Sequence, residues 1–183
     1  MAAGDTHKPP LLVIMGIAGC GKTTFGQHLA ARLGWRFFEG DEFHASANIE
    51  KMRAGVPLTD DDRRGWIVSI VEAVDQHGEA PAVLACSALS STVRRWLGAV
   101  RFHQCHWVWL DIGEADACRR IEGRDGHFMP PGLVASQLAA LAPPSDAVRL
   151  DATQECAVNA SKLLKSLADH GVVTGDVTAG GLS

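Results

Sequence analysis

Residues 16–23 read Gly16-Ile17-Ala18-Gly19-Cys20-Gly21-Lys22-Thr23, and this stretch decides the fold. It fits the phosphate-binding loop pattern G-x-x-x-x-G-K-[ST]. The apolar run 11–15 before it predicts a buried strand, and Phe25, Leu29 and Leu33 after it stand at helical spacing. Strand, loop and helix therefore follow in the order that such a loop needs. A tight glycine-rich turn without catalytic meaning is the alternative, and the Lys-Thr pair and both flanks argue against it.

Each part of this loop has a physical role in holding a nucleoside triphosphate. The glycines let backbone N–H groups curl around an anion, and the helix N-terminus adds the positive end of its dipole. Lys22 can reach the β- and γ-phosphates, and the Thr23 hydroxyl is placed to bind Mg²⁺ as the metal ligand. The expected nucleotide-binding residues are Gly16, Ile17, Ala18, Gly19, Cys20, Gly21, Lys22, Thr23 and Thr24.

Length and composition exclude several classes of protein. A chain of 183 residues with 46% hydrophobic content predicts one domain with one buried core. The net charge of −4 argues against nucleic acid as a partner. Five cysteines without C-x-x-C spacing suggest neither a disulfide framework nor a zinc site, and they favour a reducing, cytoplasmic setting. The run 11–15 is too short for a signal peptide or a membrane span, so no membrane partner is expected.

The rest of the chain alternates strand and helix patterns, which is typical of an α/β fold with helices on both faces of a parallel sheet. A helix is expected from the N-cap Thr59 to Gly78, and the last helix is expected to end at Gly171. We expect one domain over residues 1–171 and a flexible tail over 172–183. Five parallel strands result when the run 11–15 is joined by Arg36–Glu39, Ala82–Cys86, His106–Leu110 and Ala147–Leu150.

Ligands of open parallel sheets bind at the carboxyl ends of the strands, so the residues that follow each strand are candidates. Asp41 follows the second strand and can accept a proton from an attacking hydroxyl or hold a water on Mg²⁺. Taken alone, Asp41 is equally well interpreted as an Asx turn or helix cap. Ser87, not a carboxylate, follows the third strand. The metal site then rests on Thr23, phosphates and water, with Asp111 after the fourth strand as an alternative supporting carboxylate or a turn former.

Five further motifs occur in a fixed order along the chain. They are Gly40-Asp41-x-x-His44, Asn48-Ile49-Glu50-Lys51-Met52, Gly55-Val56-Pro57-Leu58-Thr59-Asp60-Asp61-Asp62-Arg63 with Trp66, Cys86-Ser87-Ala88-Leu89, and Arg124-Asp125-Gly126-His127-Phe128-Met129. Through these motifs, residues 11–167 resemble the gluconate kinase family. The resemblance implies ATP-dependent phosphorylation of the 6-hydroxyl of D-gluconate, a step of the pentose phosphate pathway. It also implies a three-layer P-loop kinase fold of the nucleoside-monophosphate-kinase type, a helical lid over about 114–131, and a homodimer.

Three other functions are alternatives to this one. A kinase for another small hydroxy acid, such as a shikimate-like substrate, is the main alternative. A non-catalytic nucleotide-binding module leaves Lys22, Thr23, Asp41 and the lid arginines unexplained together. A GTPase-type switch needs an N-K-x-D motif after a strand, and the sequence contains none.

A gluconate pocket needs several hydrogen-bonding groups and a cation for the carboxylate. Lys51 and Arg63 can supply that cation, although both are also interpretable as solvated helix-face charges. The expected substrate residues, from the motifs and the resemblance, are Asp41, His44, Lys51, Arg63, Ser87, Arg94 and His127.

Arginines of the expected lid can bring positive charge onto the γ-phosphate while the lid excludes water. Arg120 and Arg124 stand at i, i+4 and share a helix face, whereas Arg119 is expected to be solvated. With Lys22 and Asp41, the two lid arginines complete the expected catalytic set.

Two positions depart from the pattern of the family. The Cys-Ser-Ala-Leu motif usually continues with lysine, and Ser90 stands there instead. The usual Leu-Glu-x-Pro reads Leu141-Ala142-Pro143-Pro144, so a carboxylate is missing. We expect the lost lysine to weaken the grip on the acid group, and the lost carboxylate to affect nucleotide-side packing or lid contacts.

Overall fold

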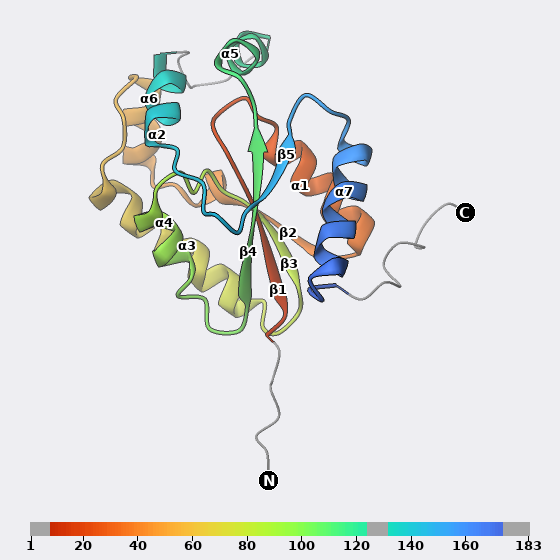
Figure 1. Cartoon of the computed structure of the whole chain (residues 1–183). Coiled ribbons are helices and arrows are strands. Elements are labelled where there is room, and N and C mark those ends of the chain that lie inside the picture. Colours follow the sequence, from red (N-terminus) through yellow and green to blue (C-terminus); the bar gives the residue numbers. More distant parts are fainter. Residues whose placement is uncertain (1–7, 124–131, 174–183) are drawn as a thin grey trace.

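The computed structural model of the chain describes residues 8–123 and 132–173. Its centre is one parallel sheet, with the strands in the order β2-β3-β1-β4-β5 (Figure 1). This confirms the predicted five-stranded parallel sheet. The strands are β1 (Pro10–Met15), β2 (Arg36–Glu39), β3 (Ala82–Ala85), β4 (Gln104–Asp111) and β5 (Val148–Asp151).

Helices cover both faces of the sheet and make a three-layer α/β fold. In Figure 1, α1 and α7 lie on one side of the sheet and α3 and α4 on the other, with α5 above the carboxyl end of β4. None of the helices in the described ranges is both long and apolar enough to cross a bilayer. The helices are α1 (Lys22–Leu33), the short 3-10 helix η1 (Gly40–Phe43), α2 (Ser46–Arg53), α3 (Asp60–Gln76), α4 (Ser91–Leu97), α5 (Glu114–Glu122), α6 (Gly132–Ala140) and α7 (Cys156–Asp169).

The central strand β1 shows why the chain folds into three layers. Leu12 and Ile14 point into the core shared with α1 and α7, whereas Leu11, Val13 and Met15 point into the core under α3 and α4. All five side chains are fully buried. A strand covered on both faces is a continuous apolar run, as parallel sheets require. This strand therefore ends inside the molecule, where it delivers the phosphate loop.

The element boundaries follow the prediction closely, and they differ most at the strand β4. Thr59 caps α3 through a capping box with Asp62, in which each side chain accepts a hydrogen bond from the other residue's backbone N–H. Strand β4 is longer than predicted because its pairing with β1 continues through the polar residue Gln104. The packed chain also extends beyond residue 171, since Val172 donates its N–H to Leu167 and Val173 packs on the core.

Candidate active site

The phosphate loop is shaped by glycine at the points where it is tightest. Gly19 has a φ of +81°, and a Cβ atom there would lie 2.6 Å from the carbonyl oxygen of Ala117 on α5. Both the left-handed backbone and the close approach exclude a side chain. The loop therefore packs directly against α5 and then enters α1 at Gly21, whose φ is +93°.

Three contacts from within the protein hold this loop. The Lys22 ammonium donates to the carbonyl of Ile17 at 3.0 Å, and the Gly16 N–H donates to the carbonyl of Ser87 at 3.3 Å. The Ala18 N–H donates to the Oε1 atom of Gln137 on α6 at 2.6 Å. The sequence did not point to Gln137, because this contact joins residues 119 positions apart. The predicted nucleotide-binding residues are thus brought together at the carboxyl end of β1.

A carboxylate that the sequence did not single out lies beside the expected metal ligand. Glu39 ends β2, and its Oε1 atom accepts the Asp41 N–H at 3.3 Å. Its Oε2 atom is buried and has no hydrogen-bond partner among the described residues. Burial raises the pKa of Glu39, as does the charge of Asp41, while the Thr23 hydroxyl and the Lys22 charge oppose the shift. Its place at the carboxyl end of a strand is the signal that could have found it.

Asp111, the alternative supporting carboxylate, is engaged elsewhere. Its Oδ2 atom accepts two hydrogen bonds from Arg149, at 2.9 Å and 2.5 Å. The Arg149 guanidinium also lies over the ring of Trp109, 5.1 Å from its centroid. This pair lines an open depression of about 500 Å³ that includes Lys162 and none of the phosphate-loop residues. The Asp111 carboxylate is therefore occupied by Arg149, whereas the Glu39 carboxylate interacts with Thr23 and Lys22 of the phosphate loop.

The acceptor segment, residues 40–66 from η1 to the first turns of α3, is organised around a stacked pair of aromatic rings. His44 stacks on Trp66 with ring centroids 4.2 Å apart, and the Trp66 indole N–H donates to the carbonyl of Gly40 at 2.6 Å. Burial lowers the pKa of His44, and the charge of Arg63 lowers it further, while Asp41 opposes both. At neutral pH the imidazole is therefore uncharged. Its Nδ1 atom is buried and finds no hydrogen-bond partner within the described part of the chain.

The two cations predicted for the substrate each have a carboxylate partner at the start of α3. Lys51 pairs with Asp62 at 2.6 Å, and Arg63 pairs with Asp60 at 3.2 Å. The Asn48 side chain adds a hydrogen bond to the Asp62 carbonyl, at 2.8 Å. The Lys51 pair and the Asn48 hydrogen bond join α2 to the start of α3, whereas the Arg63 pair lies within the first turn of α3. The ion pairs hold the side chains of Lys51 and Arg63 within the acceptor segment. A contact of either side chain with a substrate stays a prediction.

Arg94 is buried and its guanidinium is used to hold backbone. It donates to the carbonyls of Ala88, Leu89 and Ala142 at 2.8, 2.9 and 2.6 Å. Ala88 has a φ of 45°, so the arginine holds a turn that is unfavourable for a residue with a side chain. The structure gives Arg94 this positioning role, and its predicted contact with a substrate stays a prediction.

The three arginines of the expected lid differ in what the structure shows of them. Arg120 is half-buried and donates to the carbonyls of Ala152 at 2.8 Å and Cys20 at 3.4 Å. Arg119 is exposed and pairs with Asp116, as expected for a solvated neighbour. Arg124 lies outside the described residues, as do His127 and the second half of the expected lid.

Arg120 closes one side of a cavity of about 340 Å³ next to the phosphate loop. The start of α7 also lines the cavity, and there Asn159 donates to the Asp151 carbonyl at 2.8 Å and keeps a buried Oδ1 atom without a partner in the described ranges. A cavity that opens onto the start of α1, between an arginine and a polar helix start, suits a nucleoside. Its lining includes Cys20, Gly21, Thr24, Phe25, Arg120 and Asn159.

Comparison with known proteins agrees with this geometry. The family model for shikimate kinase matches residues 18–141. The gluconokinase of Gluconobacter oxydans (strain 621H) is 44% identical over 141 residues, which are 76% of this chain and 79% of that protein. The thermosensitive gluconokinase of Escherichia coli (strain K12) is 36% identical over 152 residues, covering 79% of this chain and 80% of that protein. The chain belongs to the gluconokinase family.

Solved structures show the same relationship. An unliganded sugar kinase from Janibacter sp. HTCC2649 has a TM-score of 0.82 and 34% identity, covering 92% of this chain and 98% of that chain. A gluconokinase from Sinorhizobium meliloti 1021 has a TM-score of 0.78 and 36% identity, covering 90% and 94%. The shikimate kinase of Aquifex aeolicus, at 14% identity and a TM-score of 0.57, shows the shared fold alone. The chain is therefore a phosphotransferase with a P-loop kinase fold, as the motifs predicted.

Proposed function

We propose that this member of the gluconokinase family transfers the γ-phosphate of ATP to the 6-hydroxyl of D-gluconate, giving 6-phospho-D-gluconate and ADP. One observation carries the proposal. Asp41 and the stacked His44 follow directly after β2, and the carboxylate of Glu39 at the end of β2 accepts the Asp41 N–H and lies beside Thr23 of the phosphate loop. A hydroxyl held between these residues and the loop would be in line for transfer.

Different residues stabilise the phosphate charge, accept the proton and orient the substrate. The Lys22 ammonium can exchange its hydrogen bond to Ile17 for one to a phosphate oxygen. Asp41 is exposed and accepts the proton of the attacking hydroxyl. The neutral His44 orients a substrate hydroxyl by hydrogen bonding, and Arg63 or Lys51 grips the carboxylate. Arg120 contributes positive charge from the nucleotide side, beside the carbonyl of Cys20.

The residues near the loop fit Mg²⁺. Thr23 offers a hydroxyl, and Glu39 and Asp41 offer carboxylate oxygens, which are the hard ligands that Mg²⁺ prefers. The unpartnered Glu39 Oε2 atom is the observation in favour of a cation here. No cluster of three or more His, Cys, Asp or Glu side chains able to hold a metal occurs in residues 8–123 and 132–173, so phosphates and water would complete the shell. When bound, Mg²⁺ neutralises charge on the β- and γ-phosphate oxygens.

We further propose a cytoplasmic enzyme that acts as a homodimer on small molecules. All five cysteines are free, and a reducing compartment suits them.

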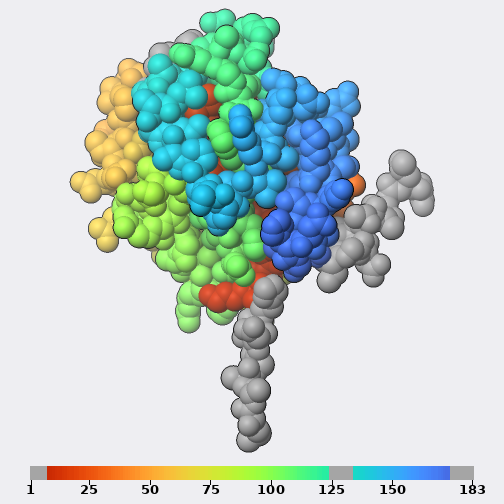
Figure 2. All heavy atoms as spheres, viewed as in Figure 1, coloured from red at the N-terminus to blue at the C-terminus, as the bar shows by residue number. Residues whose placement is uncertain are grey.

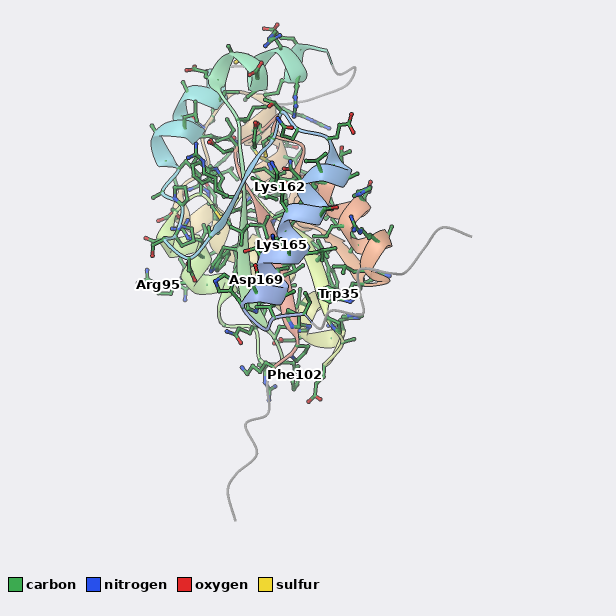
Figure 3. The ribbon with its side chains drawn as sticks, turned by 45° about the vertical axis from the view of Figure 1, so that its right-hand side comes forward. Trp35, Arg95, Phe102, Lys162, Lys165 and Asp169 are labelled. Carbon is green, nitrogen blue, oxygen red and sulfur yellow. The ribbon has the colours of Figure 1, made fainter. Side chains whose placement is uncertain are left out.

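Lys162, Lys165 and Asp169 lie along α7 (Figure 3), and all three are exposed. This face of α7 thus mixes both signs of charge and offers no uniform basic surface to a nucleic acid.

The test is an ADP-release assay with ATP and Mg²⁺ on a panel of gluconate, glucose and shikimate. We expect turnover with gluconate and a large preference over glucose, because a cation meant for a carboxylate is left unpaired by a neutral sugar. Phosphorus NMR of the product should show a phosphate ester at the 6-position. Shikimate is included because the shikimate kinase family model matches the chain. Turnover of shikimate in preference to gluconate would replace the proposed substrate, and equal rates on gluconate and glucose would reject an acid-specific pocket.

A further inference from the structure

The hydrogen bond from the Ala18 N–H to Gln137 is unusual because of its donor. Backbone N–H groups of a phosphate loop are the groups that such a loop uses to hold phosphates. At 2.6 Å from nitrogen to oxygen, this contact is the shortest that the structure gives the loop, compared with 3.0 Å for Lys22 to Ile17 and 3.3 Å for Gly16 to Ser87. Ala18 is 8% exposed, so water does not replace this partner readily.

Helix α6 presents Gln137 from a fixed position. Val134 is fully buried in the core, and Leu138 at i+4 and Leu141, directly after the end of the helix, pack against the same core. This apolar stripe sets the rotation of the helix, and Gln137 follows Val134 by three residues on an adjoining face. Atoms near the N-terminus of the chain (red) are visible between α5 (green) and α6 (teal) in Figure 2. The side chain therefore reaches the loop from a helix that is itself anchored.

The loop is thus held from three sides by elements distant in sequence. Ala117 of α5 packs on Gly19, Ser87 accepts from Gly16, and Gln137 accepts from Ala18 between them. The first two contacts use backbone and cannot be removed by substitution of a side chain. Gln137 alone among these three acts through its side chain.

We propose that Gln137 is a positioning residue for phosphoryl transfer: its Oε1 atom holds the Ala18 N–H and so fixes the half of the phosphate loop that precedes Lys22. This half connects Gly16 to Gly19 and determines where the following amides and Lys22 face. A loop held in this way needs no reorganisation when phosphates bind, which favours transfer. The inference rests on the proposed kinase function only where the test measures turnover. The measurements of ATP binding and of Ala18 hydrogen exchange do not depend on that function.

The test compares the full chain with its Gln137→Leu variant, which has similar volume and no acceptor. Hydrogen exchange of the Ala18 amide, followed by NMR, should be about tenfold faster in the variant because a buried donor loses its partner. The dissociation constant of ATP, measured without acceptor, should rise several-fold. The kcat should fall about tenfold, while the KM for gluconate stays unchanged, because the loop contacts only the nucleotide.

Two control variants separate positioning from general stability. Val74→Ala, at a buried position of α3 in the core on the other face of the sheet, should lower the melting temperature but leave Ala18 exchange in the native state and ATP affinity as in the unchanged chain. Gln27→Leu makes the same chemical change at an exposed position of α1 and should have no effect. Gln137→Met is measured in the same way if Gln137→Leu does not fold.

The outcomes are distinguishable. Unchanged Ala18 exchange in Gln137→Leu would overturn the proposal, and so would faster exchange with unchanged ATP affinity and unchanged kcat. If the unsubstituted chain fails to phosphorylate gluconate, the proposed substrate is wrong. Ala18 exchange and ATP binding would then still decide the role of Gln137.

Discussion

The phosphate loop and the acceptor segment lie at the same edge of the sheet, but they are held by different kinds of contact. Every residue from 11 to 20 is buried, and glycines, backbone groups and one side chain from outside the loop, Gln137, set its path. In the acceptor segment, side chains pair with one another at the surface, as Lys51 does with Asp62. Exposed ion pairs are weak and adjustable, whereas a backbone path is not. The nucleotide side is therefore built to be constant, and the acceptor side can be altered one side chain at a time.

The largest effect on the nucleotide side is expected from a substitution of Lys22. Lys22→Ala removes a charge that stabilises the transferring phosphate, and we expect kcat to fall by about 10³ or more. The path of the loop should persist, because the lysine ammonium contributes only one hydrogen bond to it. Turnover and circular dichroism check both halves of this prediction. A fully active variant would contradict the kinase mechanism.

On the acceptor side the largest effect is expected at Asp41. Asp41→Asn keeps the shape of the side chain but cannot accept a proton, so kcat should fall by about 10²–10³ with ATP binding retained. Single-turnover kinetics measures the rate of phosphoryl transfer, and an equilibrium titration measures the affinity for ATP. Normal turnover combined with a lower melting temperature would mean that Asp41 is a cap, which is the alternative that the sequence left open.

A pair of glycines tests whether the loop depends on its backbone path. Gly19→Ala places a Cβ atom against the Ala117 carbonyl at a φ of +81°. We expect a cost of about 2 kcal/mol, or about 4–8 °C in melting temperature, and a loss of ATP affinity. Gly34→Ala is the matched control, since its φ is +67° but nothing lies within 4 Å of its Cβ position. Equal effects at both glycines would show that the clash with α5 contributes nothing.

The sequence predicted those features that depend on neighbours along the chain. The phosphate loop, the capped start of α3 and the alternating strands all follow from local patterns, and the structure confirms them. Strand ends were less predictable because hydrogen bonding to β1 carries β4 past its apolar residues to Gln104. A strand end is decided by the partner strand, which no local pattern contains.

The side chains that support the site were the least predictable part. Gln137 acts on a residue 119 positions away, and nothing in its own surroundings along the chain indicates the contact. Arg94 was predicted as a substrate residue from its motif, yet its described hydrogen bonds hold three backbone carbonyls. Motifs identify which residues matter to a site, and tertiary contacts decide how each is used.

A smaller effect is expected from pH on the acceptor side. The pKa of His44 lies below its ordinary value of 6.5 because of burial and then the charge of Arg63. Between the folded and unfolded pKa values the unfolded chain binds more protons, so stability falls as the pH falls through that window. His44→Phe keeps an aromatic ring against Trp66 but does not titrate. Its melting temperature should therefore change less between pH 7 and pH 5 than that of the unsubstituted chain.

The control for this experiment is His28→Gln, an exposed histidine of α1. This variant should keep the pH dependence of the unsubstituted chain. If His44→Phe keeps it too, the acid sensitivity originates elsewhere and His44 is not the titrating group.

The smallest effects are expected where the chain departs from its family. Leu89 accepts the Ala142 N–H at 3.1 Å, so Ser90 and Ala142 lie next to each other, and Arg94 binds the carbonyls of both Leu89 and Ala142. Ser90 also caps α4 by accepting the Val93 N–H at 3.3 Å. Its hydroxyl therefore serves the start of α4. This cap replaces the expectation from the sequence that a lysine at position 90 grips the acid group: we now expect Ser90→Lys to lose about 1 kcal/mol of stability and to leave the KM for gluconate unchanged.

The paired substitution decides whether the missing lysine belonged to the substrate or to the fold. Ala142→Glu adds a carboxylate beside Arg94 and beside position 90, so the double variant should recover about 0.5 kcal/mol relative to the sum of the two single changes. Chemical denaturation of the four proteins measures this coupling. A lower KM for gluconate in Ser90→Lys, with no coupling to Ala142→Glu, would place position 90 in the acceptor site. The acceptor side would then extend past β3 to the start of α4, and its borders would have to be redrawn.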